Sequence, residues 1–139
     1  MADPLTILGA TAASTQLLEQ AFKIAQLIYE VYSEIRKAPA FVADRLRHIE
    51  QLISIAKVIQ QSPALQIDEV VGVLNMCMDK TRRIHPKLKE ALPGNDDRRW
   101  KRLTKSLIVI FQKKDIVTLF DDLEREKSSL MLAILAIRP

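Results

Sequence analysis

Apolar residues recur along most of the chain at alternating spacings of three and four, which is the period of an amphipathic α-helix. The clearest run forms a heptad-like seam of Leu17, Ala21, Ile24, Ile28, Val31 and Ile35. A second set widens this apolar face and consists of Leu18, Phe22, Ala25, Tyr29 and Tyr32. So wide an apolar face is typical of a helix that several neighbours contact.

The same periodicity predicts an all-α fold, a four- to five-helix bundle with a long apolar N-terminal helix. The expected helices cover residues 4–37, 40–61, 66–92, 97–112 and 115–137. Pro39, Pro63 and the Pro-Gly-Asn-Asp loop after Leu92 mark breaks between them. Pro86 falls inside the third helix, where it should kink or break the helix. We treat residues 1–139 as one helical bundle domain, because this length suffices to bury a core.

The N-terminal segment is distinguished by its lack of charge, since residues 4–18 contain no Asp, Glu, Lys or Arg. Fifteen residues fall short of the roughly 20 that a membrane-spanning helix needs. Two interpretations stay open: the segment is a core helix of the bundle, or it is a membrane-active segment that the bundle stores. The candidate membrane-insertion residues are Leu5, Ile7, Leu8, Gly9, Leu17 and Leu18.

The net charge of +4 hides an asymmetry between the two parts of the chain. Residues 1–79 carry six Lys or Arg and nine Asp or Glu, whereas residues 80–139 carry fifteen and eight. The single Cys77 excludes an internal disulfide and is compatible with a reducing compartment. No Lys or Arg precedes the first apolar run, so a secretory signal is not indicated and we expect a cytoplasmic protein.

Basic residues gather in two rows at helical spacing. These rows are Lys80, Arg83 and Lys87, and then Arg98, Arg99, Lys101, Arg102 and Lys105. A solvated face is the simplest interpretation, and anionic membrane lipids are the partner that such rows would attract. Nucleic acid is disfavoured, because Trp100 alone offers little base stacking and no recognition motif is present.

An acidic face on the last expected helix is the natural counterpart of these rows. Asp121 and Asp122 belong to it, and they can pair with the basic rows within one bundle or between protomers. They are therefore the candidate self-assembly residues, and self-association or a homotypic helical-domain partner is expected.

No constellation for catalysis or cofactor binding is visible. The chain lacks a GxxxxGK[ST] phosphate loop and a catalytic triad. His48 and His85 have no nearby ligands at metal-binding spacing, and no base is identified for Cys77. We expect no enzymatic activity, no cofactor, no metal site and no small-molecule substrate.

Two stretches carry a resemblance to a known family. They are MADPLTILGATAASTQLLEQAFKI at residues 1–24 and RRWKRLTKSLIVIFQKKDIVTLFDDLEREKSSLMLAI at residues 98–134. In these motifs the chain resembles the HeLo-like or Ses-A-like N-terminal domains of fungal STAND and NLR-like proteins. The resemblance implies a helical bundle, similar in fold to the four-helix executioner bundle of necroptosis, at the front of an intracellular receptor.

What the resemblance implies for function is immune-like cell death and heterokaryon incompatibility. The mechanism would be oligomerisation, relocation to the plasma membrane and insertion of the N-terminal helix. Glu19 and Lys23 interrupt the apolar run, so partial insertion of residues 4–18 fits this chain better than one long span. The alternative is a homotypic interaction module, an adaptor that never enters lipid.

Overall fold

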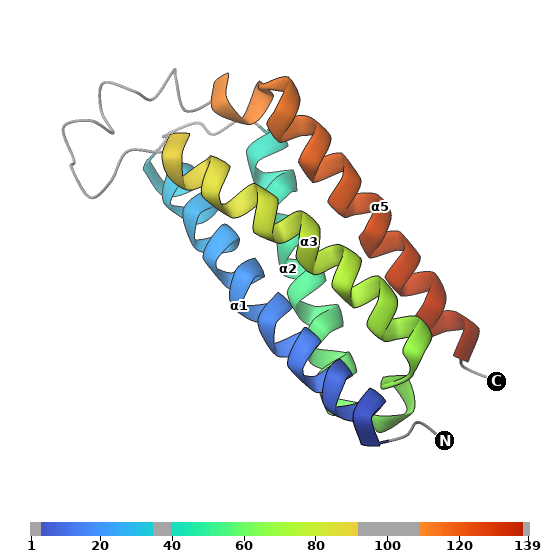
Figure 1. Ribbon diagram of the computed structural model, residues 1–139. Helices are drawn as coiled ribbons and strands as arrows, with labels where there is room; N and C mark the ends of the chain where they lie inside the picture. Colours follow the sequence, from blue (N-terminus) through green and yellow to red (C-terminus); the bar gives the residue numbers. More distant parts are fainter. Residues whose placement is uncertain (1–3, 35–39, 92–108, 138–139) are drawn as a thin grey trace.

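The computed structural model describes residues 4–34, 40–91 and 109–137, and within these ranges the chain is helical with short turns and no strand. Its elements are α1 (Pro4–Glu34), α2 (Ala40–Gln61), the 3-10 turn η1 (Pro63–Leu65), α3 (Asp68–Ala91) and α5 (Lys114–Ile137) (Figure 1). The fold is therefore an all-α helical bundle, as the periodicity predicts. Most of the helix expected at 97–112 lies outside the described residues.

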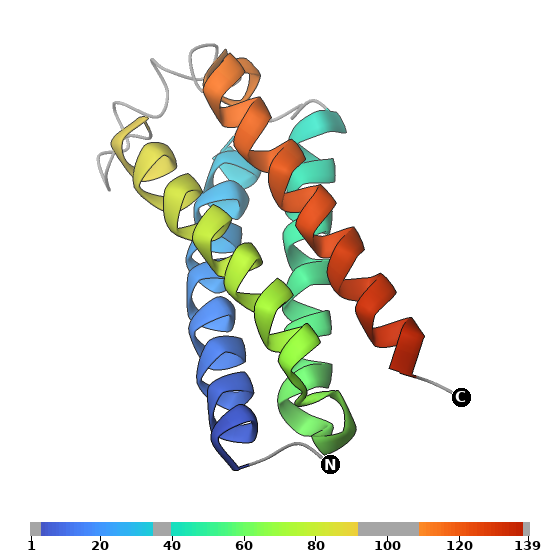
Figure 2. The same cartoon turned by 45° about the vertical axis from the view of Figure 1, so that its right-hand side comes forward.

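The helices are arranged around α1 and α3 (Figures 1 and 2). α1 packs against α2 and α3, and α3 also packs against α5, whereas α2 and α5 make much less contact. α1 and α3 run in one direction, and α2 and α5 run in the other. The start of α1, the turn η1 and the end of α5 consequently lie at the same end of the bundle. Toward this end α5 spreads away from α2 (Figure 2).

The predicted seam of α1 is the centre of the core. Leu17, Ala21, Ile24, Ile28 and Val31 are all fully buried. They face α2 and α3, because a stripe with a period of 3.6 residues stays on one side of the helix.

The flanking apolar face of α1 is buried only in part, which corrects the expectation of a wide buried face. Leu18 is buried, but Phe22, Tyr29 and Tyr32 are 50%, 60% and 43% exposed. Two neighbouring helices cover only the seam, so these aromatic rings lie on the surface. The Lys57 ammonium lies 5.4 Å from the centroid of the Phe22 ring, a cation–π contact that partly covers it.

The long apolar N-terminal helix is not found in the form expected. α1 is 31 residues long, but its outward positions include Gln16, Glu19, Lys23 and Gln26 as well as the exposed rings. Within residues 4–34, 40–91 and 109–137, no helix combines the length and the hydrophobicity needed to cross a membrane.

α3 continues through Pro86 rather than breaking there. Its inner face is fully buried at Val70, Leu74, Cys77, Ile84 and Leu88. Burial, with a smaller contribution from the charge of Glu126, raises the pKa of the Cys77 thiol to about 12. The thiol is therefore protonated at neutral pH, and only a thiolate is a strong nucleophile.

We predict that iodoacetamide labels Cys77 only after the protein unfolds. The native thiol lacks both solvent contact and thiolate character. Mass spectrometry after labelling, with and without urea, measures the modified fraction. Rapid labelling of the native chain at neutral pH would contradict this account of the core.

Candidate interaction surface

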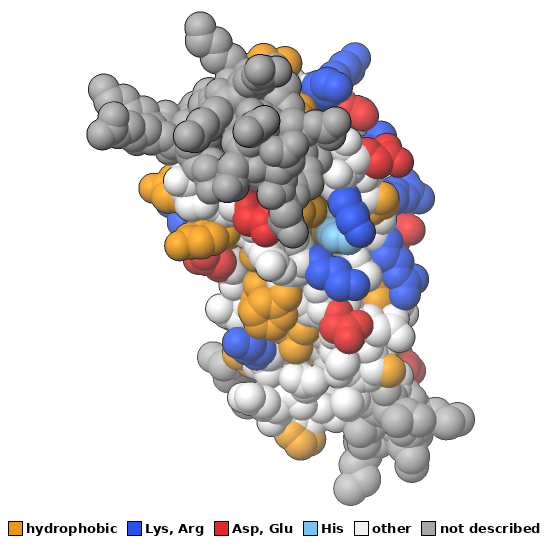
Figure 3. Space-filling view, turned by 90° about the vertical axis from the view of Figure 1, so that its left-hand side faces the viewer, with side chains coloured by type: hydrophobic (Ala, Val, Ile, Leu, Met, Phe, Trp, Pro, Cys, Tyr) orange, Lys and Arg blue, Asp and Glu red, His pale blue; other side chains and the backbone are white. Residues whose placement is uncertain are grey.

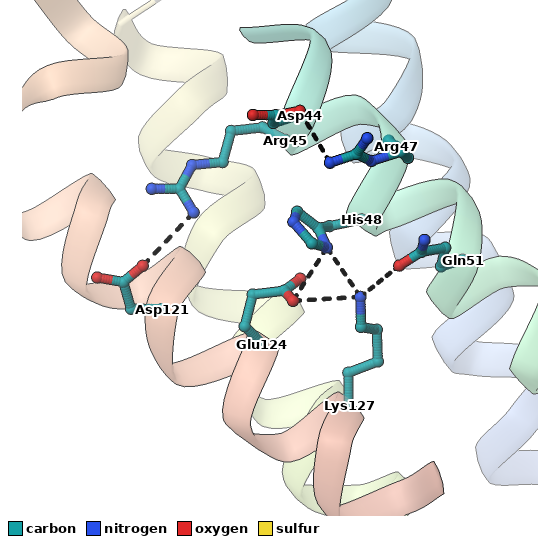
Figure 4. A network of polar contacts seen from close by, with 8 residues as sticks. All are labelled: Asp44, Arg45, Arg47, His48, Gln51, Asp121, Glu124 and Lys127. Atoms are coloured by element: carbon teal, nitrogen blue, oxygen red, sulfur yellow. Dashed lines mark hydrogen bonds and ion pairs between the residues drawn. The ribbon is translucent and has the colours of Figure 1, made fainter. Parts of the chain in front are cut away.

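The contact between α2 and α5 begins as a ladder of polar pairs (Figure 4). Its rungs are Arg45–Asp121 at 3.5 Å, His48–Glu124 at 3.0 Å and Gln51–Lys127 at 2.7 Å. Each rung lies three residues beyond the previous one on both helices, so the two helices run in parallel with a fixed register. Residues three apart share one helix face, which lets the ladder form without bending either helix.

Lys127 is the buried member of this ladder, with only 5% of the residue exposed. Its Nζ donates to Gln51 Oε1 at 2.7 Å and lies 2.9 Å from His48 Nδ1 and 3.2 Å from Glu124 Oε2. The Lys127 ammonium finds acceptors in the Gln51 amide oxygen and the Glu124 carboxylate. His48 Nδ1 can either donate to Glu124 or accept from Lys127, but one ring nitrogen cannot do both. A buried charge is tolerated when it is paired and hydrogen-bonded in this way. Lys127 therefore ties α5 to α2.

After Gln51 on α2 and Lys127 on α5, the facing sides of the two helices become apolar. Beyond the last rung, α2 carries Ile55 and Val58 on this side, and α5 carries Met131 and Ile134. The helices have spread here and leave a hollow of about 280 Å³. It is lined by Ser54, Ile55, Val58, Met131, Ile134 and Leu135. We call this feature the α2/α5 groove.

Large apolar side chains remain exposed around the groove. Val58 and Met131 are each 46% exposed, Leu135 is 60% exposed, and the adjacent Leu132 is 66% exposed. Apolar side chains scattered singly on a surface need no explanation, but a contiguous cluster around a hollow is typical of a binding site.

The groove belongs to a larger region without charged side chains. The bundle brings together four segments that contain no Asp, Glu, Lys or Arg, namely residues 4–18, 58–67, 70–78 and 128–137. We call them the charge-free end. Asp68 and Glu69 interrupt it, in the first turn of α3, where negative charge is favourable to the helix dipole. In Figure 3 the coloured charged side chains gather in the upper and middle parts of the face, and the described side chains toward its lower end are mostly white and orange.

The predicted basic row on α3 lies away from this region and faces α5. Lys80 approaches Asp122 at 3.9 Å, and Lys87 donates to Asp115 at 3.1 Å. The hydrogen bond from Lys87 holds the pKa of the Asp115 carboxyl below its usual range. Arg83 pairs along its own helix with Asp79 at 3.3 Å. Each member of this row thus has an acidic neighbour within the chain.

A wide basic cleft between α3 and α5 adds two lysines that the sequence reasoning did not single out. Lys113 and Lys114 join Arg83 and Lys87 in its lining, with Asp115 among them. The second predicted row lies outside the described residues. It consists of Arg98, Arg99, Lys101, Arg102 and Lys105.

The candidate self-assembly residues are engaged inside the bundle. Asp121 pairs with Arg45, and Asp122 lies 3.9 Å from Lys80 and 3.3 Å from Arg125. Pairing of the acidic face within one bundle therefore occurs, and pairing between protomers remains a hypothesis.

The candidate membrane-insertion residues differ in their burial. Leu17 and Leu18 are buried in the core, and Gly9 is partly buried. A side chain at Gly9 would meet no atom within 4 Å, so packing does not require glycine there. Leu5, Ile7 and Leu8 have side chains outside the described residues.

Sequence reasoning missed the Lys127 network and the groove. A signal was present, because Arg45, His48 and Gln51 share the spacing of the three polar partners on α5. His48 lies on the face of α2 that joins this network. His85 lies on α3 near Lys23 and Lys89, and partial burial together with these charges lowers its pKa.

Comparison of the chain with family models, curated proteins and solved structures found no match. The likeness to fungal NLR-like domains therefore stays a hypothesis, and the surface geometry is the observation that bears on function.

We predict that Lys127→Ala lowers the free energy of unfolding by about 2 kcal/mol, since it removes a buried, charge-assisted network and leaves a cavity. Urea denaturation followed by circular dichroism measures the change. Arg125→Ala, on the same helix with a 78% exposed side chain, is the control and should change stability by less than about 0.5 kcal/mol. Equal effects of the two substitutions would contradict the assigned role of Lys127.

Proposed function

We propose that this chain is a non-enzymatic signalling module that works by homotypic association, with copies meeting at the charge-free end. The observation that carries the proposal is the α2/α5 groove with its exposed Met131, Leu132 and Leu135. In keeping with the sequence resemblance, we place the module at the front of a fungal NLR-like system, where association of such domains would start the response.

The distribution of charge supports association at this end. Cores of protein interfaces are depleted of charged residues and enriched in methionine and apolar side chains. The whole chain carries a net charge of +4, which opposes contact between copies elsewhere on the surface. Contact through the charge-free end avoids both this repulsion and the cost of removing charges from water.

We predict that the protein self-associates as its concentration rises and that added salt leaves this association intact or strengthens it. Salt screens charge pairs but does not weaken apolar contacts. Sedimentation velocity at low and high ionic strength measures the oligomer fraction.

Asp121→Lys with Asp122→Lys separates this mechanism from assembly through charge pairs. We expect the double variant to associate as the parent chain does, because neither carboxylate lies at the charge-free end. Association that salt or this variant abolishes would favour pairing of acidic and basic faces between protomers. A monomer at every concentration would overturn the homotypic proposal.

A second candidate function is membrane execution through residues 4–18, and the uncharged character of that segment favours it. Because Leu17 and Leu18 are buried, release of this segment has a free-energy cost. Their exposure on release would cost about 3–6 kcal/mol. Lipid contact or oligomerisation would have to supply that energy, so the bundle would hold the segment at rest.

Dye release from anionic vesicles tests this candidate. A short bis-maleimide bridge between Thr15→Cys and Gln60→Cys would hold α1 on α2, because the native side chains are hydrogen-bonded at 2.9 Å. If the candidate is right, the unbridged protein causes leakage and the bridged protein does not. The two single-cysteine variants, treated with the same reagent, are the controls. Equal leakage with and without the bridge would rule out release of α1.

A further inference from the structure

The surface around the α2/α5 groove offers both a hollow and a projecting apolar side chain. It contains a hollow of about 280 Å³ and, one turn along α5 from Ser128, the projecting Leu132. A contact between two identical copies about a two-fold axis requires both features on one patch, because each residue pair then occurs twice.

We propose that two copies of this chain pack about a two-fold axis, so that Leu132 of each copy enters the α2/α5 groove of the other. This inference rests on the proposed homotypic function and adds the surface and the mode of contact. The apolar lining of the groove, from Ile55 and Val58 on one helix and Met131 on the other, would then surround a leucine side chain.

Charge favours a second copy as the occupant over a membrane. The four charge-free segments lack Lys and Arg by definition, and they also contain no Trp or Tyr. Membrane-facing surfaces usually carry these residues, as basic contacts to headgroups and as aromatic anchors at the interface. The rim of the groove instead offers neutral polar groups such as Ser54 and Ser128.

The two-fold arrangement also separates the charged parts of the copies. α5 carries Asp121, Glu124 and Arg125 before its uncharged last turns, and the ladder to α2 occupies the seam there. Two copies that meet through the groove residues of α2 and residues 128–137 of α5 keep this charged part of α5 outside the contact.

Leu135→Lys and Tyr29→Lys form a matched pair of variants, since both positions are 60% exposed but only Leu135 lines the groove. We expect Leu135→Lys to weaken dimerisation at least about tenfold, because it places a charge in the buried contact. Tyr29→Lys should dimerise as the parent chain does. Circular dichroism should show that both variants remain folded, because neither position belongs to the core.

Cross-linking tests the mode of contact. A chain with Ser54→Cys is mixed with a size-tagged chain carrying Leu132→Cys, and mild oxidation should yield the mixed disulfide. Thr118→Cys, exposed on the charged part of α5, replaces Leu132→Cys in the control and should give no mixed product. The native Cys77 can remain in all chains because it is buried.

Each outcome decides the proposal. We expect Leu135→Lys but not Tyr29→Lys to lose the dimer. We also expect Ser54→Cys to form the mixed disulfide with Leu132→Cys but not with Thr118→Cys. Dimers that survive Leu135→Lys would overturn this interface and leave homotypic association standing. A parent chain that never associates would overturn both. If the chain stays monomeric and binds neutral vesicles, and Leu135→Lys abolishes this binding, the groove is a lipid-binding site and the proposal is wrong.

Discussion

The packing of α1 between α2 and α3 is the constraint on which the rest of the bundle depends. Its fully buried seam includes Leu17, Ile24 and Ile28, and each large apolar side chain of this kind contributes about 1.5–3 kcal/mol. A few such side chains approach the whole net stability of a small domain. α5 is attached differently, since it packs on α3 and meets α2 along a single seam. The groove exists because no further described helix closes that side.

At Lys127 the contacts between α2 and α5 change from polar to apolar. Before Lys127 along the helices, the polar pairs Arg45–Asp121 and His48–Glu124 hold α2 and α5 in register. Beyond it along both helices, Ile55, Val58 and Met131 line the α2/α5 groove, where the two helices spread apart. The first part of the seam is thus complete within one chain, whereas the second leaves apolar surface for a partner. Lys127 thus separates the part of α5 that the bundle uses from the part that we propose a second copy uses.

The sequence predicted the elements well, because they depend on local periodicity. α2 covers the expected residues 40–61, and α5 begins one residue before the expected 115. The width of the α1 face was predicted poorly. Phe22, Tyr29 and Tyr32 fall within an apolar arc, but the arc does not show how many neighbours cover it. Only the arrangement of α2 and α3 decides that.

The candidate surface depended on information that periodicity does not contain. The sequence shows that residues 4–18 lack charge and that residues 130–137 are apolar all round. It does not show that both segments meet residues 58–67 at one end, since this follows from the directions of four helices. The pairing of His48 with Glu124 likewise depends on a register between distant segments. The basic row on α3 was visible, but its neutralisation by Asp115 and Asp122 was not.

The central claim is that copies of this chain meet at the charge-free end. Backbone amide chemical shifts, followed by NMR from dilute to concentrated solution, test it most directly. The account predicts concentration-dependent shifts confined to residues 54–67 and 128–137, with residues 79–90 unchanged. Shifts centred on Lys80–Lys87 and Asp115–Asp122, with residues 128–137 unchanged, would contradict it.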